Sequence, residues 1–418
     1  MRVYLGFVGC KLNLAEVEAL GRRLRQAGAE LVDAPDGADL CLFNTCTVTG
    51  AAAGKSRRAV RQLLRRAPEA RVVVSGCHAT QAPAELAALS PRVLLVDNAH
   101  KEEIPALLGL AAAPHEPGGQ PWGLRTRAFV KVQDGCDNHC TYCVVCIARG
   151  PQRSRPLEEI VQEAAQRVAE GYRELVLTGV HVGAYGRDCG PDLTHLVRAL
   201  LERTEVRRLR LSSIEPHDLR ADFLDLWSDP RLCPHLHLPL QSGCDATLQR
   251  MGRRYTASQF ADLAAAARQA IPDLALTTDV IVGFPGETDD EFQDSLGFVQ
   301  ALAFARVHVF TYSPRPGTLA AAMPRQVPPE AARARHAALA AEAQASARRF
   351  AQRFVGREMP VLFEQRAGPA DAAGVAAWVG LTGNYLRVWA PSAEDLGNRI
   401  RRVRLLQVQG GRVRGDVV

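Results

Sequence analysis

Short apolar runs alternate with helical patterns along most of the chain, and this alternation restricts the possible folds more than any other feature of the sequence. Over the first 108 residues the apolar runs are residues 2–8, 39–44, 71–75 and 93–96, and the helical patterns are residues 14–27, 56–66 and 84–89. Strands and helices in this order predict a parallel sheet covered by helices. We therefore expect an α/β domain at the N-terminus.

The alternation continues on a larger scale from residue 128. The candidate strands are residues 128–133, 174–178, 207–213, 235–240, 274–282 and 306–312. Helical patterns lie between them, for example at residues 157–169 and 257–270, and a long Ala-rich and Arg-rich helical pattern follows at residues 329–354. Six β/α units predict a barrel or partial barrel, in which reactive residues lie where strands end and loops begin.

The last segment, residues 356–418, has a different pattern. Its short alternating runs are separated by Gly turns, which predicts a small antiparallel β domain or barrel. This segment carries nine Arg against six acidic residues. Turn and linker residues fill positions 109–127, a composition typical of a domain boundary. We predict an α/β protein of three domains, at residues 1–120, 121–355 and 356–418.

The cysteines argue against a secreted, disulfide-linked protein. There are 11 of them in 418 residues, so they cannot all pair within one chain, and domains of this size do not need disulfides to fold. The first residues lack the long apolar core of a secretory signal, and no apolar run is long enough to cross a bilayer. We therefore expect a cytoplasmic protein with no membrane partner, in which clustered thiols are metal ligands or catalysts.

Three cysteines stand close together just after a predicted strand. Cys136, Cys140 and Cys143 have spacings of four and three residues, so their thiolates can bind one iron–sulfur cluster from a single loop. Three ligands on a four-iron cluster leave one iron free to bind a small chelating molecule. The alternative is a zinc site, but a second Cys pair or a Cys/His pair at finger spacing is missing.

Three further cysteines follow predicted strands of the N-terminal domain. Cys10, Cys46 and Cys77 each come at the end of an apolar run. Strand ends at one edge of a parallel sheet lie close together, so these thiols can share a second cluster. The alternative for each residue taken alone is a buried structural cysteine.

The spacing of Cys136, Cys140 and Cys143 resembles the cluster signature of radical S-adenosylmethionine (SAM) enzymes. Further segments match that superfamily in order along the predicted strand ends: Leu-Thr-Gly at 177–179, Leu-Ser-Ser-Ile-Glu-Pro at 211–216, His-Leu-Pro-Leu-Gln-Ser-Gly at 237–243 and Thr-Asp-Val-Ile-Val-Gly at 278–283. The resemblance implies that SAM chelates the open iron. The residues expected to bind the cofactor are Thr178, Gly179, Ser213, Glu215, Gln241 and Gly283.

The N-terminal cysteine triplet ahead of this signature resembles the methylthiotransferase family, from about residue 6 to the C-terminus. Membership implies an auxiliary [4Fe-4S] cluster on Cys10, Cys46 and Cys77, a radical SAM [4Fe-4S] cluster in a partial barrel, and a small RNA-contacting β module called TRAM. Residues 44–49 (Asn-Thr-Cys-Thr-Val-Thr) and 55–58 (Lys-Ser-Arg-Arg) resemble the branch that modifies N6-threonylcarbamoyladenosine at position 37 of tRNA. The alternatives are the branches that act on isopentenyladenosine or on an aspartate of a ribosomal protein, and, outside enzymes, an RNA-binding iron–sulfur protein.

The resemblance also implies a reaction. One SAM supplies a methyl group to a sulfur on the auxiliary cluster, and a second is cleaved to a 5′-deoxyadenosyl radical that attacks the C2–H bond of the adenine. That bond has no useful acidity, so radical chemistry is the expected way to activate it. The electron donor is expected to be a flavodoxin or a ferredoxin, and the adenine is expected to be splayed out of the anticodon loop.

Basic residues cluster between residues 55 and 71. The five that we expect to bind RNA are Lys55, Arg57, Arg58, Arg61 and Arg65. Arg57, Arg61 and Arg65 have i, i+4 spacing and therefore share one face of the predicted helix. Such a face can neutralise phosphates of the tRNA anticodon stem-loop. The alternative is a solvated Arg-rich helix face with no partner.

Cys146 departs from the family pattern, in which related chains usually carry Pro. It lies three residues after Cys143, and a fourth thiol there could in principle bind the last iron and block SAM. We expect it to lie outside the cluster and to be idle.

Overall fold

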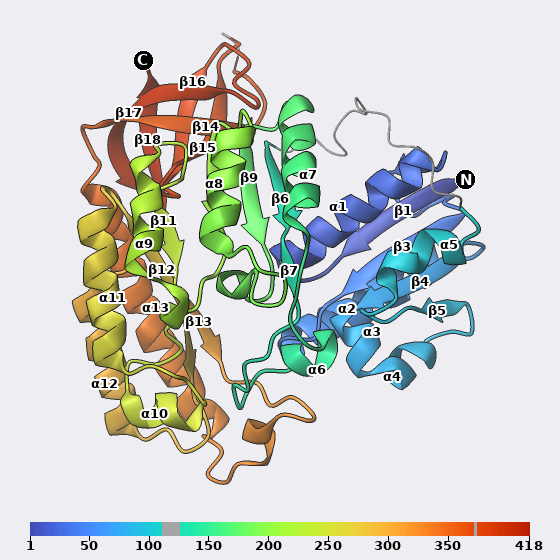
Figure 1. The fold of residues 1–418 in the computed structure, drawn as a ribbon, viewed down its shortest axis with the longest axis horizontal. Coiled ribbons are helices and arrows are strands. Elements are labelled where there is room, and N and C mark those ends of the chain that lie inside the picture. The colour runs from blue at the N-terminus through green and yellow to red at the C-terminus, as the bar shows by residue number, and fades with distance from the viewer. Residues whose placement is uncertain (111–125, 372–373) are drawn as a thin grey trace.

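The computed structural model describes residues 1–110, 126–371 and 374–418, and it contains three parts (Figure 1). An N-terminal α/β domain lies beside the first strands of a central α/β region, and a C-terminal β-barrel lies at one end of the central strands. The fold class predicted from the sequence is confirmed. The predicted boundary between residues 120 and 121 lies outside the described residues.

The N-terminal domain is built on a five-stranded parallel sheet. The strand order is β2-β1-β3-β4-β5. The strands are β1 (Arg2–Phe7), β2 (Glu30–Val32), β3 (Leu40–Thr45), β4 (Arg71–Gly76) and β5 (Val93–Leu95), and the helices are α1 (Lys11–Gln26), α2 (Gly50–Arg66), α3 (Cys77–Gln81), α4 (Pro83–Ala87) and α5 (Ile104–Leu107). Sequence analysis did not find β2, because three residues are too few to show a period.

Both faces of this sheet are apolar, as a sheet covered on each side by helices requires. Leu5, Leu42 and Val73 pack with α1 on one face. Phe43 and Val74 pack with α2 and α4 on the other. The strands are therefore fixed in the middle of two hydrophobic layers, and only their ends are free to carry chemistry.

The central region is a partial barrel made of two three-stranded parallel sheets. The sheets are β10-β9-β6 and β11-β12-β13, and two isolated bridges, Leu209 with Leu232 and Ser213 with His237, connect the segments of β10 and β11. The strands are β6 (Arg127–Lys131), β9 (Glu174–Thr178), β10 (Arg208–Leu211), β11 (His235–His237), β12 (Ala275–Val282) and β13 (Arg306–Thr311). β11 is shorter than expected because Pro234 and Pro239 flank it, and proline has no N–H to donate to a neighbouring strand.

Helices cover the outside of the partial barrel. The longest of them are α7 (Leu157–Ala169), α8 (Leu193–Arg203), α11 (Ala257–Ala270), α12 (Asp289–Leu302) and α13 (Pro329–Gln352), and the shorter ones are α9 (Ala221–Leu224) and α10 (Asp245–Arg250). Leu177, Leu211 and Val280 point outward to this helical layer and form the main core with it. The residues that alternate with them therefore point into the lumen of the partial barrel.

A short antiparallel ribbon holds the loop with the three clustered cysteines. Its strands are β7 (Gln133–Asp134) and β8 (Arg153–Ser154), and the short helix α6 (Val145–Arg149) lies between them. The ribbon brings the two ends of the loop together, and α6 leads away from the third cysteine. Figure 1 shows α6 beside α3 of the N-terminal domain.

The C-terminal part is a closed five-stranded barrel, β14-β15-β16-β18-β17. Its strands are β14 (Glu358–Arg366), β15 (Ala376–Thr382), β16 (Arg387–Ser392), β17 (Ile400–Gln409) and β18 (Arg412–Val417). All neighbouring strands are antiparallel except β16 and β18, which are parallel. Phe350, in the last turn of α13, and Phe354, just after the helix, pack into the same core as Phe363 and Trp378. The barrel is therefore attached to the central region through apolar contacts.

No helix in the described part of the chain is both long enough and apolar enough to span a membrane.

Candidate active site

The structure brings Cys10, Cys46 and Cys77 to one edge of the N-terminal sheet. Cys10 precedes α1, Cys46 directly follows β3, and Cys77 is the first residue of α3 after β4. Because β1, β3 and β4 are adjacent and parallel, their carboxyl ends meet at the same edge. Cys10 is exposed, whereas Cys46 and Cys77 are buried. The arrangement is the one that the sequence predicted, and ligation of a cluster by these thiols stays a prediction.

Polar side chains fix the turns that carry these cysteines. The Asn13 amide donates to Val8 O at 2.9 Å and to Thr45 O at 3.1 Å, which joins the turns after β1 and β3. The Ser56 hydroxyl accepts from Cys46 N–H and donates to Cys46 O, both at 3.0 Å. Gly76 has a φ of 97°, and a Cβ at this position would lie 2.4 Å from Thr45 O. Only glycine fits there.

Backbone hydrogen bonds hold the second triplet, Cys136, Cys140 and Cys143. Cys136 N–H donates to Gly150 O at 3.1 Å, and Cys143 N–H donates to Cys140 O at 3.0 Å. Thr141 N–H donates to Met251 O at 3.0 Å, which anchors the loop to the turn after α10. All three sulfurs belong to half-buried residues. The loop therefore keeps part of its surface open to solvent.

The three sulfurs of each triplet lie farther apart than the ligands of a single metal ion do. Two thiolates on one zinc ion are each about 2.3 Å from it and so lie less than about 5 Å apart. Among the described residues, no set of three cysteines has its sulfurs within 4.8 Å of one another. A cubane cluster places each thiolate on a different iron, so it accepts a wider triangle of ligands.

Burial makes the free thiols weak acids. It raises the pKa of Cys46 to about 11 and the pKa of Cys143 to about 12. Such thiols are almost fully protonated at neutral pH and are poor nucleophiles, whereas a bound metal centre deprotonates its thiol ligands outright. The donor set is thus suited to holding metal clusters.

Two cationic or hydrogen-bonding side chains contact the sulfurs of the second triplet. Arg253 Nη1 lies 3.3 Å from Cys140 Sγ, and its other terminal nitrogen is paired with the Glu215 carboxylate. His181 Nδ1 lies 3.9 Å from Cys136 Sγ, and its Nε2 lies 2.5 Å from Asp218 Oδ2. Although burial lowers the pKa of His181, the hydrogen bonds to Asp218 and Cys136 raise it to about 9. Both groups place positive charge beside thiolates that a cluster needs deprotonated.

Arg149 connects the two triplets. It is the last residue of α6, which follows Cys143, and it crosses to the N-terminal domain, where its Nε lies 3.3 Å from Cys77 Sγ. Its terminal nitrogens donate to Glu16, Asp134 and Asn13 at 2.8–2.9 Å. All five donors of this side chain face the protein interior, and its charged end is almost fully buried. The position of Arg149 therefore ties the loop of one triplet to the sheet edge of the other.

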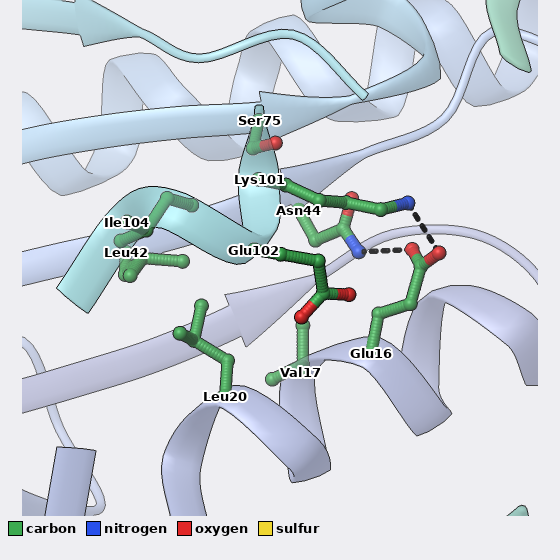
Figure 2. A pocket seen from close by; sticks show the side chains of 9 residues that line it. All are labelled: Glu16, Val17, Leu20, Leu42, Asn44, Ser75, Lys101, Glu102 and Ile104. Atoms are coloured by element: carbon green, nitrogen blue, oxygen red, sulfur yellow. Dashed lines mark hydrogen bonds and ion pairs between the residues drawn. The ribbon is translucent and has the colours of Figure 1, made fainter. Parts of the chain in front are cut away.

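A buried charge network surrounds Arg149. Glu16 also accepts from Lys101 and Lys131, and Lys131 lies 2.8 Å from Asp134. Figure 2 shows the Lys101 and Asn44 side chains directed at the Glu16 carboxylate. The five charged members are Glu16, Lys101, Lys131, Asp134 and Arg149, so cations outnumber anions by one. Burial alone would raise the pKa of Glu16. Arg149 and both lysines have the larger effect and hold the pKa of Glu16 well below its usual range.

The six residues expected to bind SAM all lie where central strands end. Thr178 closes β9, with Gly179 next to it, and Ser213 and Glu215 follow β10. Gln241 comes after β11 and has a φ of 67°, a strained value for a residue with a side chain. Gly283 comes directly after β12. Contact between these residues and the cofactor stays a prediction.

Close neighbours leave no room for a side chain at Gly179 and Gly283, which the sequence did not reveal. A Cβ on Gly179 would lie 2.9 Å from Gln133 O, and a Cβ on Gly283 would lie 2.8 Å from the Ala332 side chain. Glu215 is likewise already engaged, since it pairs with Arg253. Each of these residues thus has a structural partner within the chain in addition to its predicted role.

The predicted RNA-binding residues lie on α2, which begins earlier than expected because Thr49 caps it by accepting from Ala52 N–H at 3.1 Å. Arg57 is half-buried and pairs with Glu85 at 2.7 Å, so its charge is largely neutralised. Among the described residues, no ion pair is found for the other four predicted cations. These are Lys55, Arg58, Arg61 and Arg65, and all are exposed. The free positive charge of α2 therefore rests on these four residues.

Several side chains near the cysteines were not predicted from the sequence. Arg149, His181 and Arg253 contact cysteine sulfurs, yet single basic residues far from one another in the sequence show no pattern. Arg149 had one available signal, its position six residues after Cys143. Cys146, which we expect to be idle, directs its thiol to Cys143 O at 3.6 Å.

The chain is similar to known proteins over most of its length. Residues 130–299 match the radical SAM superfamily, and residues 2–97 match a family described as uncharacterized protein family UPF0004. The chain is 35% identical to the threonylcarbamoyladenosine tRNA methylthiotransferase MtaB of Bacillus subtilis, over 96% of this chain and 92% of the relative. It is 39% identical to the protein of the same name from Thermotoga maritima, over 85% of each.

A relative with a different substrate in its name is also similar. The tRNA-2-methylthio-N(6)-dimethylallyladenosine synthase of Acidothermus cellulolyticus is 36% identical over 87% of this chain and 78% of that protein. Among solved structures, the radical SAM methyltransferase TsrM of Kitasatospora setae superposes with a TM-score of 0.59 at 16% identity, over 77% of each chain. That likeness concerns the fold alone.

Proposed function

The chain belongs to the radical SAM methylthiotransferase family, and we propose that it transfers a methylthio group to C2 of N6-threonylcarbamoyladenosine at position 37 of tRNA. The observation that carries this proposal is the near full-length similarity to relatives named for that substrate, at 32–39% identity. Two cysteine triplets joined by Arg149 support it.

Two [4Fe-4S] clusters and SAM are the cofactors. We assign Cys10, Cys46 and Cys77 to the auxiliary cluster and Cys136, Cys140 and Cys143 to the cluster that binds SAM. When bound, these groups supply the one-electron chemistry that replaces hydrogen by a methylthio group at an unactivated ring carbon.

The chain's own residues hold and shield this chemistry. Arg253 and His181 place positive charge at Cys140 and Cys136, and Arg149 does the same at Cys77. These contacts favour the thiolate form that iron requires. Arg149 contacts the auxiliary triplet from the helix that follows Cys143, so it links the two sites directly.

The proposed partners are tRNA, through its anticodon stem-loop, and a flavodoxin or ferredoxin as electron donor. Lys55, Arg58, Arg61 and Arg65 on α2, together with the basic C-terminal barrel, are assigned to phosphate contacts. We propose that the reaction takes place in the cytoplasm, as expected for an enzyme that modifies tRNA.

Nucleoside analysis of tRNA tests the substrate. In a deletion strain without a paralogue, 2-methylthio-N6-threonylcarbamoyladenosine disappears and the precursor accumulates, and the wild-type gene restores the product. A Cys77→Ala gene does not restore it. Loss of the methylthio form of isopentenyladenosine instead, or of methylthiolation of a ribosomal aspartate, would reject the substrate assignment in favour of another family branch.

Anaerobic reconstitution tests the enzyme class. We expect about eight iron atoms per chain, as two four-iron clusters require, and reductive formation of 5′-deoxyadenosine from SAM. Tight zinc binding without 5′-deoxyadenosine would instead support a non-catalytic RNA-binding protein.

A further inference from the structure

A cavity of about 500 Å³ lies where all three parts of the chain meet. Its walls are the lumen-facing residues of β11, β12 and β13, the end of α13, and the turn between β15 and β16. Lys11, from the start of α1, completes the lining. Lys11 is the residue directly after Cys10, so one part of the lining comes from the segment that carries the first cysteine of the auxiliary triplet.

The lining is rich in cations. Lys11, Arg306 and Arg387 all face the cavity, and no ion pair is found for any of the three within the described residues. The acidic side chain in the lining, Glu364, is already paired with Arg127 at 2.8 Å. The cavity therefore holds positive charge that the chain itself does not neutralise.

The buried end of the cavity carries an unpartnered polar atom. His235 is only 3% exposed, and its Nε2 lies 3.1 Å from Thr277 Oγ1. Its Nδ1 is buried and has no hydrogen-bond partner. An orphaned buried nitrogen is costly unless a ligand satisfies it.

The histidines of the cavity respond to the surrounding positive charge. Burial and the nearby Arg210 and Lys11 hold the pKa of His235 well below its usual value. Burial and Arg306 likewise lower the pKa of His308. Both shifts favour the neutral form of the ring, and Asp279, which raises the pKa of His308, offsets the shift of that histidine only in part.

The shape of the cavity is maintained by Tyr385, in the turn that enters from the C-terminal barrel. The Arg210 guanidinium lies 3.8 Å from the centre of the Tyr385 ring, and the His235 ring lies 4.5 Å from it. Tyr385 has a φ of 64°, which is unfavourable for a residue with a side chain. Backbone strain persists where the surrounding structure enforces it, commonly at ligand sites.

We propose that this cavity binds the carboxylate of the N6-threonylcarbamoyl group of the target nucleoside, through Lys11, Arg306 and Arg387. This inference rests on the proposed function and adds to it the residues that select the substrate. An isopentenyl group in the same place would leave these three cations without an anionic partner, so the cavity favours the carboxylate over it. The one other source of the same anionic chemistry is a backbone phosphate of the anticodon loop.

Binding measurements separate these two sources without using activity. Three anticodon stem-loop RNAs are compared by fluorescence anisotropy with the anaerobically reconstituted protein: one with threonylcarbamoyladenosine at position 37, one with adenosine, and one with the neutral carboxamide analogue. We expect the carboxylate RNA to bind roughly tenfold more tightly than the other two, a typical gain for a charge-assisted contact.

Variants at the mouth of the cavity locate that preference. Arg306→Gln and Arg387→Gln should each reduce the preference to about twofold while leaving the affinity for the adenosine RNA unchanged. Arg58→Gln on α2 is the matched control and should weaken all three RNAs equally. Unchanged cluster absorbance and melting temperature show that the variants are folded.

Two outcomes would overturn the inference. Equal weakening of all three RNAs by the cavity variants would assign the cations to a phosphate, and a wild-type protein with no preference for the carboxylate would leave the cavity without the proposed role. The nucleoside analysis of the deletion strain tests the proposed function separately. If the threonylcarbamoyl product is lost in that strain but the protein shows no preference for the carboxylate RNA, only the cavity assignment is rejected.

Discussion

Arg149 is the residue on which the joint arrangement of the two cysteine triplets depends most. Its guanidinium contacts Cys77 Sγ, Glu16, Asp134 and Asn13 at once. A planar guanidinium with five N–H donors can contact all four of these groups at once. A lysine ammonium, which is a compact point charge, cannot. The sequence shows Arg149 as one of many arginines, because its partners come from three separate segments.

Replacing Arg149 tests this role. Arg149→Met leaves two buried carboxylates short of a partner, so we expect the free energy of unfolding of the apoprotein to fall by about 3 kcal/mol. We also expect reconstituted iron to fall from about eight toward about four atoms per chain, because the Cys77 thiolate loses its cation. Arg149→Lys should be intermediate. Urea unfolding and iron analysis measure the two effects.

Arg153→Met is the matched control, since Arg153 is exposed on β8 and makes no ion pair in the described part of the chain. It should leave both quantities unchanged. Full iron loading and an unchanged urea midpoint in Arg149→Met would show that Arg149 does not link the two sites.

At the scale of elements, the sequence predicted most strands and helices well. β9, α7 and α11 have the bounds expected from their patterns. The two helices are long segments with a clear period, and β9 is a short run that is buried throughout. The misses have local causes. Proline shortens β11, and Thr49 starts α2 six residues before its apolar periodicity begins. β7 and β8 are two residues each, too short for any period.

Helix α2 also shows why the basic face was only partly predictable. The i, i+4 spacing grouped Arg57 with Arg61 and Arg65, but Glu85 on α4 pairs with Arg57. That partner is 28 residues away in the sequence and adjacent only after folding. The free face is therefore Lys55, Arg58, Arg61 and Arg65.

We predict that Arg58→Gln combined with Arg61→Gln weakens binding of an anticodon stem-loop whatever its base at position 37. Each lost phosphate contact should reduce the slope of log K against log salt by about 0.7 to 0.9. Stability should not change, because both side chains are exposed. Anisotropy titrations at several salt concentrations measure the slope. Arg198→Gln, on the exposed face of α8, is the control, and an unaltered slope in the double variant would remove α2 from the RNA interface.

At the scale of the whole molecule, the three parts meet around the lumen of the partial barrel. Arg208 and Arg210, on β10, donate to Leu381 O and Gly383 O of the C-terminal barrel, at 2.9 and 2.8 Å. Asn384 donates to Asp273 O at 3.2 Å. The sequence predicted the three parts but not these contacts. A strand pattern does not indicate which loop will close the lumen of the partial barrel. The cationic cavity is a product of this assembly.

The attachment of the C-terminal barrel depends on a fully buried ion pair, and its dependence on pH can be predicted. Arg210 Nε lies 2.8 Å from Glu174 Oε1, and neither side chain is exposed. Burial raises the pKa of Glu174, but Arg210 outweighs it and lowers the pKa below its usual value. A carboxylate with a lowered pKa stabilises the fold at all pH values above its unfolded pKa, about 4.3. That stabilisation is lost as the pH falls through the folded pKa.

Glu174→Gln removes the charge and keeps the shape, which leaves Arg210 buried without a counter-ion. We expect the variant apoprotein to be about 3 kcal/mol less stable at pH 7, and the difference from wild type to shrink as the pH falls below about 4. Urea unfolding at pH 7, 5, 4 and 3 measures it. Glu158→Gln, which removes an exposed partner of Arg203, should behave as wild type at every pH. A Glu174→Gln deficit that stayed constant from pH 7 to pH 3 would mean that the Glu174 charge does not hold the barrel in place, and that the packing of Phe350 and Phe354 does so alone.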